Sequence, residues 1–159
     1  MSSSVNYKPN DYNHITPYLI AKEARKALEF YKKVLGAEVV MCMDGPDNRI
    51  MHSELRIGDS KFMLADECEE AHAKSPASYG GSPVGLYVYV PNVDEVAKLA
   101  EKEGATITRP LENQFYGDRT CTFTDPFGHI WSIGTHIEDV SEEETQRRME
   151  KMMKEQSSK

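Results

Sequence analysis

Three residues that can transfer a proton or bind an anion alternate along the segment 49–57. His52, Glu54 and Arg56 fall on one side of an extended chain, because successive side chains of a strand point to opposite faces. A carboxylate can orient an imidazole as a general base, and an arginine can hold an anionic substrate. The sequence therefore makes His52 and Glu54 candidate catalytic residues. The same alternation also fits the wet face of an antiparallel strand, and that interpretation stays open.

The elements that carry these residues occur twice along the chain. A strand at 14–21 and a helix ending at Gly36 precede strands at 37–43, 49–57 and 60–67. The second set has a strand at 85–90, a helix capped by Asn92 and ending near Gly104, and strands near 105–109, 118–124 and 129–136. This repeat predicts an α+β fold in which two βαβββ modules form a curved mixed sheet with the helices outside. We expect a ligand in the crevice between the modules.

The predicted organisation is one domain over 13–140. Its modules cover about 13–67 and 85–138, and a linker rich in Gly, Pro and Ser joins them over 68–84. Residues 1–12 are expected to be a flexible N-terminus. A charged helix is expected over 141–159, starting at the capping box of Ser141 and Glu144. Its methionines indicate shallow docking or a dimer contact, although a solvated, frayed helix fits equally well.

Composition excludes several classes of function. The 159 residues carry a net charge of −7, which disfavours binding to nucleic acid. No apolar stretch reaches the roughly 20 residues that cross a bilayer, so a membrane protein is not expected. The start of the chain does not read as a secretion signal, and its three cysteines share no pairing pattern. We therefore expect a cytoplasmic protein.

Several motifs in the chain resemble one protein family. Ile15-Thr16-Pro17-Tyr18-Leu19, the helix segment from Phe30-Tyr31 to Leu35-Gly36-Ala37, and Asp125-Pro126-Phe127-Gly128-His129 are similar to motifs of the vicinal oxygen chelate superfamily. This superfamily includes glyoxalase I, bleomycin-resistance proteins and extradiol dioxygenases, and the chain most resembles its PhnB-like branch. The resemblance implies a U-shaped sheet around a small molecule. In the metal-dependent members, four strand residues also hold a divalent ion there.

The positions that match the four metal ligands of glyoxalase I are poor ligands in this chain. They fall near Ile15 or Thr16 and at Leu64, Gly85 and Ser132. None of these side chains replaces the hydration shell of a divalent ion well. We therefore expect no metal site and no cofactor.

Strand alternation instead predicts a pocket wall of aromatic and hydroxyl side chains. The expected ligand-binding residues are Phe62, Leu64, Asp66, Tyr87, Tyr89, Thr120, Thr122, Thr124 and Ser132, with Arg119 at the rim. Such a wall stacks a planar or apolar molecule and orients it by a few hydrogen bonds. Tyrosine and threonine also favour strands in general, so an ordinary half-exposed sheet face is the alternative.

Two functions follow from these observations. The first is a PhnB-like protein that binds a small, aromatic or apolar molecule and forms a homodimer, since related chains often complete their pockets across a two-fold axis. The second is a metal-dependent lyase, isomerase or dioxygenase of the same superfamily. Its ligands would be His52, Glu54 and a further histidine, with His129 and His136 as the available donors.

Overall fold

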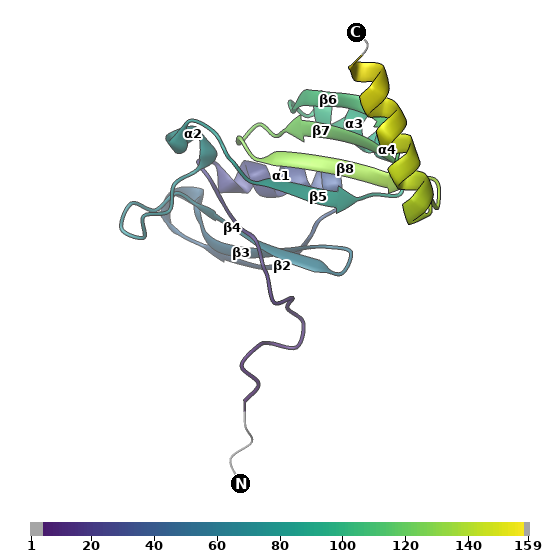
Figure 1. Ribbon diagram of the computed structural model, residues 1–159. Helices are drawn as coiled ribbons and strands as arrows, with labels where there is room; N and C mark the ends of the chain where they lie inside the picture. Colours follow the sequence, from purple (N-terminus) through teal and green to yellow (C-terminus); the bar gives the residue numbers. More distant parts are fainter. Residues whose placement is uncertain (1–4, 158–159) are drawn as a thin grey trace. The chain divides into compact units, whose positions relative to one another are not determined.

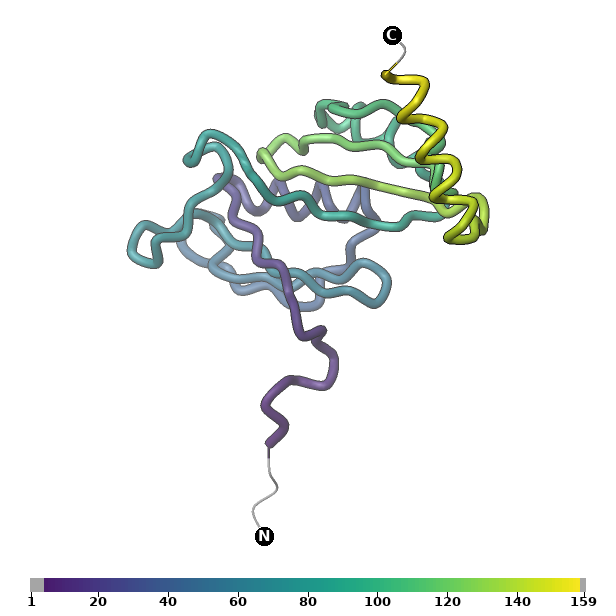
Figure 2. The backbone as a smooth tube through the Cα atoms, in the orientation of Figure 1, coloured from purple at the N-terminus to yellow at the C-terminus, as the bar shows by residue number. Residues whose placement is uncertain are grey.

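The computed structural model describes residues 5–157 and contains the order β-α-β-β-β twice (Figure 1). By its internal contacts the chain forms two compact units, the first ending at Ser82 and the second beginning at Pro83. Figure 2 traces the backbone through both repeats. The predicted α+β class with two βαβββ modules is confirmed. The outermost parts of the two predicted terminal segments, residues 1–4 and 158–159, lie outside the described residues.

The first unit is a four-stranded mixed sheet with one long helix. Its elements are β1 (Tyr18–Ala21), α1 (Ala24–Leu35), β2 (Glu38–Asp44), the short 3-10 helix η1 (Pro46–Asn48), β3 (Ile50–Ile57), β4 (Ser60–Asp66) and α2 (Pro76–Tyr79). The strand order is β1-β4-β3-β2, and β1 runs parallel to β4 at the edge. An edge position fits Pro17 just before β1, because proline has no amide to donate to a ladder. The segment predicted as a linker contains one helical turn, α2.

The core of the first unit lies between α1 and one face of this sheet. The buried side chains of α1 are Ala24, Ala27, Leu28, Phe30, Tyr31, Val34 and Leu35. The helix ends at Gly36, whose φ of 65° is the left-handed conformation that glycine adopts without a Cβ clash. Leu19, Leu55 and Leu64 supply the sheet side of the core.

The second unit repeats this arrangement. Its elements are β5 (Gly85–Tyr89), α3 (Val93–Lys102), β6 (Thr106–Asn113), β7 (Asp118–Thr124), β8 (Ile130–His136) and α4 (Glu142–Gln156). The strand order is β5-β8-β7-β6, with β5 parallel to β8. The structure extends β6 to Asn113, beyond the predicted end at 109. Pro110 is tolerated there because β6 is an edge strand, and two register shifts interrupt its pairing with β7.

The second core lies between α3 and the sheet. Val93, Ala97 and Ala100 are buried on α3. Facing them from the sheet are the buried side chains Cys121, Phe123, Trp131 and Ile133. As predicted, Asn92 caps the helix by accepting a hydrogen bond from the amide of Glu95 at 3.2 Å.

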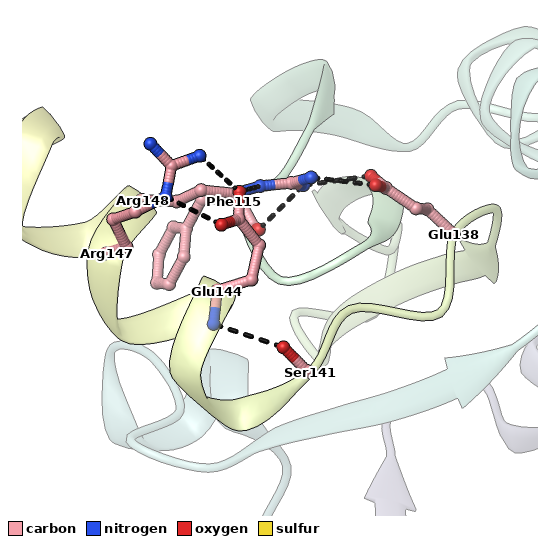
Figure 3. A network of polar contacts seen from close by, with 6 residues as sticks. All are labelled: Phe115, Glu138, Ser141, Glu144, Arg147 and Arg148. Atoms are coloured by element: carbon pink, nitrogen blue, oxygen red, sulfur yellow. Dashed lines mark hydrogen bonds and ion pairs between the residues drawn. The ribbon is translucent and has the colours of Figure 1, made fainter.

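The C-terminal helix α4 is held to the second unit by charge rather than by burial. The Ser141 hydroxyl accepts the Glu144 amide hydrogen bond at 3.2 Å, as the capping box predicted. Arg148 donates to both Glu138 and Glu144 and to the carbonyl of Phe115 (Figure 3). None of the side chains described in α4 is buried. Within residues 5–157, no helix combines the length and the hydropathy that a bilayer crossing requires.

Candidate functional site

The polar stripe of β3 lies on the sheet face that points away from α1. Ser53 and Leu55 are fully buried on the helix side. His52 and Glu54 alternate with them along the strand, so these two side chains face the other way. Arg56 shares their face, but its guanidinium donates to Glu38 at 2.6 Å and is exposed. The predicted alternation is therefore present, while Arg56 is engaged in a surface ion pair.

His52 contacts an aromatic residue from the edge strand as well as Glu54. Its Nδ1 lies 2.9 Å from the hydroxyl of Tyr18, and the two rings pack edge to face with centroids 5.5 Å apart. On the other side of the imidazole, Nε2 lies 3.7 Å from Oε1 of Glu54. Tyr18, His52 and Glu54 thus form a continuous row on one sheet face.

Lys61 on β4 extends this row and was missed by the sequence analysis. Its Nζ lies 3.7 Å from Oε2 of Glu54, and only 5% of its side chain is exposed. The N-terminal segment covers it: Asp11 forms an ion pair with Nζ, and the ring of Tyr12 lies 4.3 Å from it. The position of Lys61 in an otherwise apolar strand could have indicated a buried ion pair, because lysine is rarely buried without a partner.

Tyr12 covers the end of the row at Glu54 and Lys61. Its hydrogen bond to Glu54, together with burial, raises the pKa of Tyr12 to about 12. Lys61 holds the pKa of Asp11 below its usual value by the hydrogen bond between them. Residues 11 and 12, predicted to lie in a flexible segment, therefore contact the sheet.

A cavity of about 740 Å³ opens beside Tyr18 within the first unit. Its strand residues are Tyr18, Ile20, Ile50, Met51, Ala65 and Asp66, whose polar groups are the Tyr18 hydroxyl and the Asp66 carboxylate. The remaining lining comes from the turn before β3 and the segment after β4, namely Pro46, Arg49, Glu67, Cys68, Glu70, Ala71 and Ala73. Hydrogen bonding from Ser75, followed by that from the hydroxyl of Ser78, lowers the pKa of Glu67 to about 2. An apolar site with few polar groups is the usual form of a small-molecule pocket.

Two residues predicted to line a pocket lie in the core instead. Phe62 packs edge to face on Tyr31 of α1, with centroids 5.8 Å apart, and Leu64 is fully buried on the same side. The orientation predicted for them is wrong, because Met63 and Ala65 occupy the face away from the helix. Asp66 does line the cavity, but its oxygens accept the backbone amides of Ala24 at 3.0 Å and Ile50 at 2.7 Å.

The second unit carries its own polar cluster around Asp118, which is buried. One carboxylate oxygen accepts the hydroxyls of Tyr89 at 2.9 Å and Tyr87 at 3.3 Å, and the other lies 2.7 Å from Nδ1 of His136. Burial, followed by the charge of Asp118, raises the pKa of Tyr87. The hydrogen bond to Asp118 raises the pKa of His136, and Asp139 adds to this effect. Tyr87 and Tyr89 face away from α3, as predicted.

The hydroxyl residues of β7 and β8 lie on that same face. Thr120, Thr122, Thr124 and Ser132 alternate with the buried side chains of the second core. The hydroxyls of Thr122 and Ser132 are 3.0 Å apart. Arg119 lies on the helix side instead, where its guanidinium donates twice to Asp94 at 2.8 Å. Arg119 was predicted to lie at a pocket rim, and this prediction is wrong, because the guanidinium forms an ion pair with the first turn of α3.

The His52 and Glu54 pair does not fit a metal ion. Glu54 is engaged by Tyr12 and Lys61, and His52 by Tyr18. Across residues 5–157, no three His, Cys, Asp or Glu side chains converge in a way that could hold a cation. Of the two histidines considered as further donors, His136 faces the Asp118 cluster, while His129 is buried in the turn before β8.

Known proteins are similar to this chain in sequence or in fold. A model of the Glyoxalase/Bleomycin resistance protein/Dioxygenase superfamily matches residues 11–133. Protein Mb0911c of Mycobacterium bovis is 36% identical over 138 residues, covering 85% of this chain and 91% of that protein. Two solved structures show the same fold. TioX from Micromonospora sp. ML1 has 23% identity and a TM-score of 0.61, covering 79% of this chain and 99% of that one. A PhnB protein from Bacillus cereus has 19% identity and a TM-score of 0.60, with coverages of 77% and 99%.

The family model spans both repeats, and the relative from Mycobacterium bovis matches over most of its own length. The motifs around Phe30-Tyr31 and Asp125-Pro126 fall within the matched residues. The chain belongs to the glyoxalase/bleomycin resistance protein/dioxygenase superfamily.

Proposed function

We propose that this protein binds a small apolar or aromatic molecule in the cavity of its first unit. The observation that carries the proposal is the cavity itself, whose volume of about 740 Å³ lies within the range of small-molecule sites. Tyr18 offers a ring for stacking, and Ile20 and Ala65 offer apolar contact. The charged side chains of the lining are Arg49, Asp66, Glu67 and Glu70. Asp66 and Glu67 accept hydrogen bonds from the protein itself, so Arg49 and Glu70 are assigned the orientation of a polar substituent of the ligand.

The proposal is tested by filling the cavity with a bulky side chain. Ala73 lines the cavity and is partly exposed, so a tryptophan at this position occupies the ligand's volume. The matched control is Ala77→Trp on α2, which is exposed and does not line the cavity. The probe is N-phenyl-1-naphthylamine, a neutral aromatic molecule that fluoresces in apolar sites. We expect it to bind the wild type and A77W alike and to bind A73W at least tenfold more weakly. Equal affinity in all three proteins contradicts the proposal.

The class of the natural ligand is then identified by measuring the unfolding temperature with a panel of compounds. The panel comprises glutathione adducts, aromatic antibiotics and quinones. A ligand that binds only the folded state raises stability by about 2.7 kcal/mol when present at 100 times its dissociation constant. A compound that stabilises the wild type but not A73W identifies the class that the cavity accepts.

We further propose that the protein is a cytoplasmic homodimer. Its three cysteines are free thiols, a state typical of a reducing compartment. Two-fold dimers are the commonest form of protein oligomer. Light scattering during size-exclusion chromatography tests the dimer, and a mass of one chain at micromolar concentration refutes it.

A further inference from the structure

Tyr18 connects the cavity with the polar row on the sheet. Its side chain both lines the cavity and contacts the imidazole of His52. The edge strand β1 brings it there, because Tyr18 pairs in register with Met63 of β4, which in turn pairs with Glu54 of β3. Whatever occupies the cavity therefore lies beside a phenol that is hydrogen-bonded to an imidazole.

Beyond Tyr18 the row has the order of a proton relay. The hydroxyl lies 2.9 Å from Nδ1 of His52, and Nε2 lies 3.7 Å from Oε1 of Glu54. The His52 side chain is 24% exposed and that of Glu54 13%, so both are largely withdrawn from water. A phenol, an imidazole and a carboxylate follow one another in the order of nucleophile, base and acid that activates hydroxyl groups in enzymes. The contact between Nε2 and Glu54, at 3.7 Å, is an electrostatic one and is longer than a hydrogen bond.

The far end of the row is closed and its charge is balanced. Lys61 lies 3.7 Å from the second oxygen of Glu54, and Asp11 pairs with Lys61. The ring of Tyr12 lies against the same ammonium group. The row is therefore covered at Lys61 and open at the cavity. A proton on the row can be exchanged with a bound molecule only at the Tyr18 end.

We propose that Tyr18 acts as a general base toward a substrate in the cavity, with His52 accepting its proton and the charge of Glu54 stabilising the imidazolium that forms. The inference rests on the proposed binding function and deepens it by naming the substrate class. That class is an apolar or aromatic molecule with a weakly acidic C–H or O–H group. Tyr18 is the catalytic residue, and His52 and Glu54 act through it as relay and positioning residues.

The step is balanced in protons and electrons. The Tyr18 oxygen takes the substrate proton while its own proton moves to Nδ1 of His52. The electron pair of the broken bond stays on the substrate, and the imidazolium formed is stabilised by the carboxylate of Glu54. On reprotonation of the substrate the same protons move back. The relay requires a phenol that is protonated at rest, and burial raises the pKa of Tyr18 in the direction that keeps it so.

The test uses 5-nitrobenzisoxazole, a flat apolar molecule that opens to a coloured nitrophenolate when a base removes its ring proton. Removal of that proton breaks the N–O bond, which leaves a nitrile and a phenolate oxygen that takes the electron pair. When this product leaves, the imidazolium of His52 returns its proton through Tyr18 to water. General bases typically accelerate such steps by about 10²- to 10⁴-fold. We expect the full chain to accelerate the reaction over buffer, and Y18F and H52Q to lose at least tenfold in kcat. Y79F, altered at an exposed tyrosine of α2, is the matched control and should react like the wild type.

Positioning and structural roles are separated by two further measurements. E54Q should lower kcat with little change in KM, because it removes the charge that stabilises the imidazolium of His52 and leaves the cavity wall unchanged. In nitrogen NMR spectra of the histidines, Y18F should shift the Nδ1 resonance of His52, whereas Y79F should leave it unchanged.

Binding is followed separately by displacement of N-phenyl-1-naphthylamine with 5-nitrobenzisoxazole. Loss of rate in Y18F and H52Q with displacement intact supports the relay. Displacement with equal rates in the wild type and Y18F overturns the relay and leaves the binding proposal standing. Failure of N-phenyl-1-naphthylamine itself to bind overturns both proposals.

Discussion

Asp66 gives the sharpest test of how the first unit is held together. It was expected to contact a ligand, yet its two carboxylate oxygens accept the amides of Ala24 and Ile50 at 3.0 and 2.7 Å. Ala24 is the first residue of α1, whose N-terminal amides have no partner within the helix. Glu23 precedes it and makes no side-chain cap. Asp66 therefore caps α1 from the end of β4.

The cost of removing this cap follows from the two hydrogen bonds. A hydrogen bond to a charged group contributes about 1.5–3 kcal/mol, and the lower end applies here because the adjacent cavity admits water to the released amides. D66A should therefore destabilise the first unit by about 3 kcal/mol. D66N keeps one carbonyl oxygen, so it can preserve one of the two bonds and should lose about half as much. Asp59 lies in the exposed turn before β4, and D59A is the matched control.

The measurement is amide hydrogen exchange followed by NMR, which reports the stability of the first unit through amides in α1 and β3. Far-UV circular dichroism during urea unfolding gives an independent value. A loss below about 1 kcal/mol for D66A would refute the capping role. So would identical values for D66A, D66N and D59A.

Three further outcomes are expected. A Cβ at Gly134 would lie 2.3 Å from the Tyr87 hydroxyl oxygen, so G134A should lower the unfolding temperature. G85A, whose Cβ meets nothing closer than 3.7 Å, should be tolerated; equal effects would contradict this packing. The pKa of His136 is raised above 6.5 by its partners, so its stabilising contribution is complete below pH 6.5 and is lost as pH rises through the raised value. NMR titration should give a lower pKa for His136 in D139N, and an unchanged value would argue against that contact. Zinc or manganese should leave the unfolding temperature unchanged, whereas a rise that saturates at one ion per chain would overturn the expectation of no metal site.

The sequence determined the repeat and the two helix faces because these depend on local periodicity. Apolar residues three and four apart define a helix face whatever the rest of the chain does. The apolar residues of α1 at this spacing are buried, and Cys121 and Phe123, which alternate with Thr120, Thr122 and Thr124, pack toward the helix. Glycines after the helices and the cap at Asn92 are likewise local signals.

Alternation failed in β4 for a physical reason. Phe62, Met63, Leu64 and Ala65 are consecutive and apolar, so the pattern does not tell which face meets the helix. The packing of Phe62 on Tyr31 settles the question, and that contact joins a strand to a helix far away in the chain.

The cavity and the row that adjoins it were decided by tertiary structure alone. Tyr18 and His52 are 34 positions apart, and Lys61 and Asp11 are 50 apart. No local pattern encodes such distances, because they arise when β1 joins the sheet in parallel beside β4 and the N-terminal segment then crosses that face. The sequence supplied an imidazole and a carboxylate two residues apart; only strand pairing gave them a phenol at one end and a covered ammonium at the other.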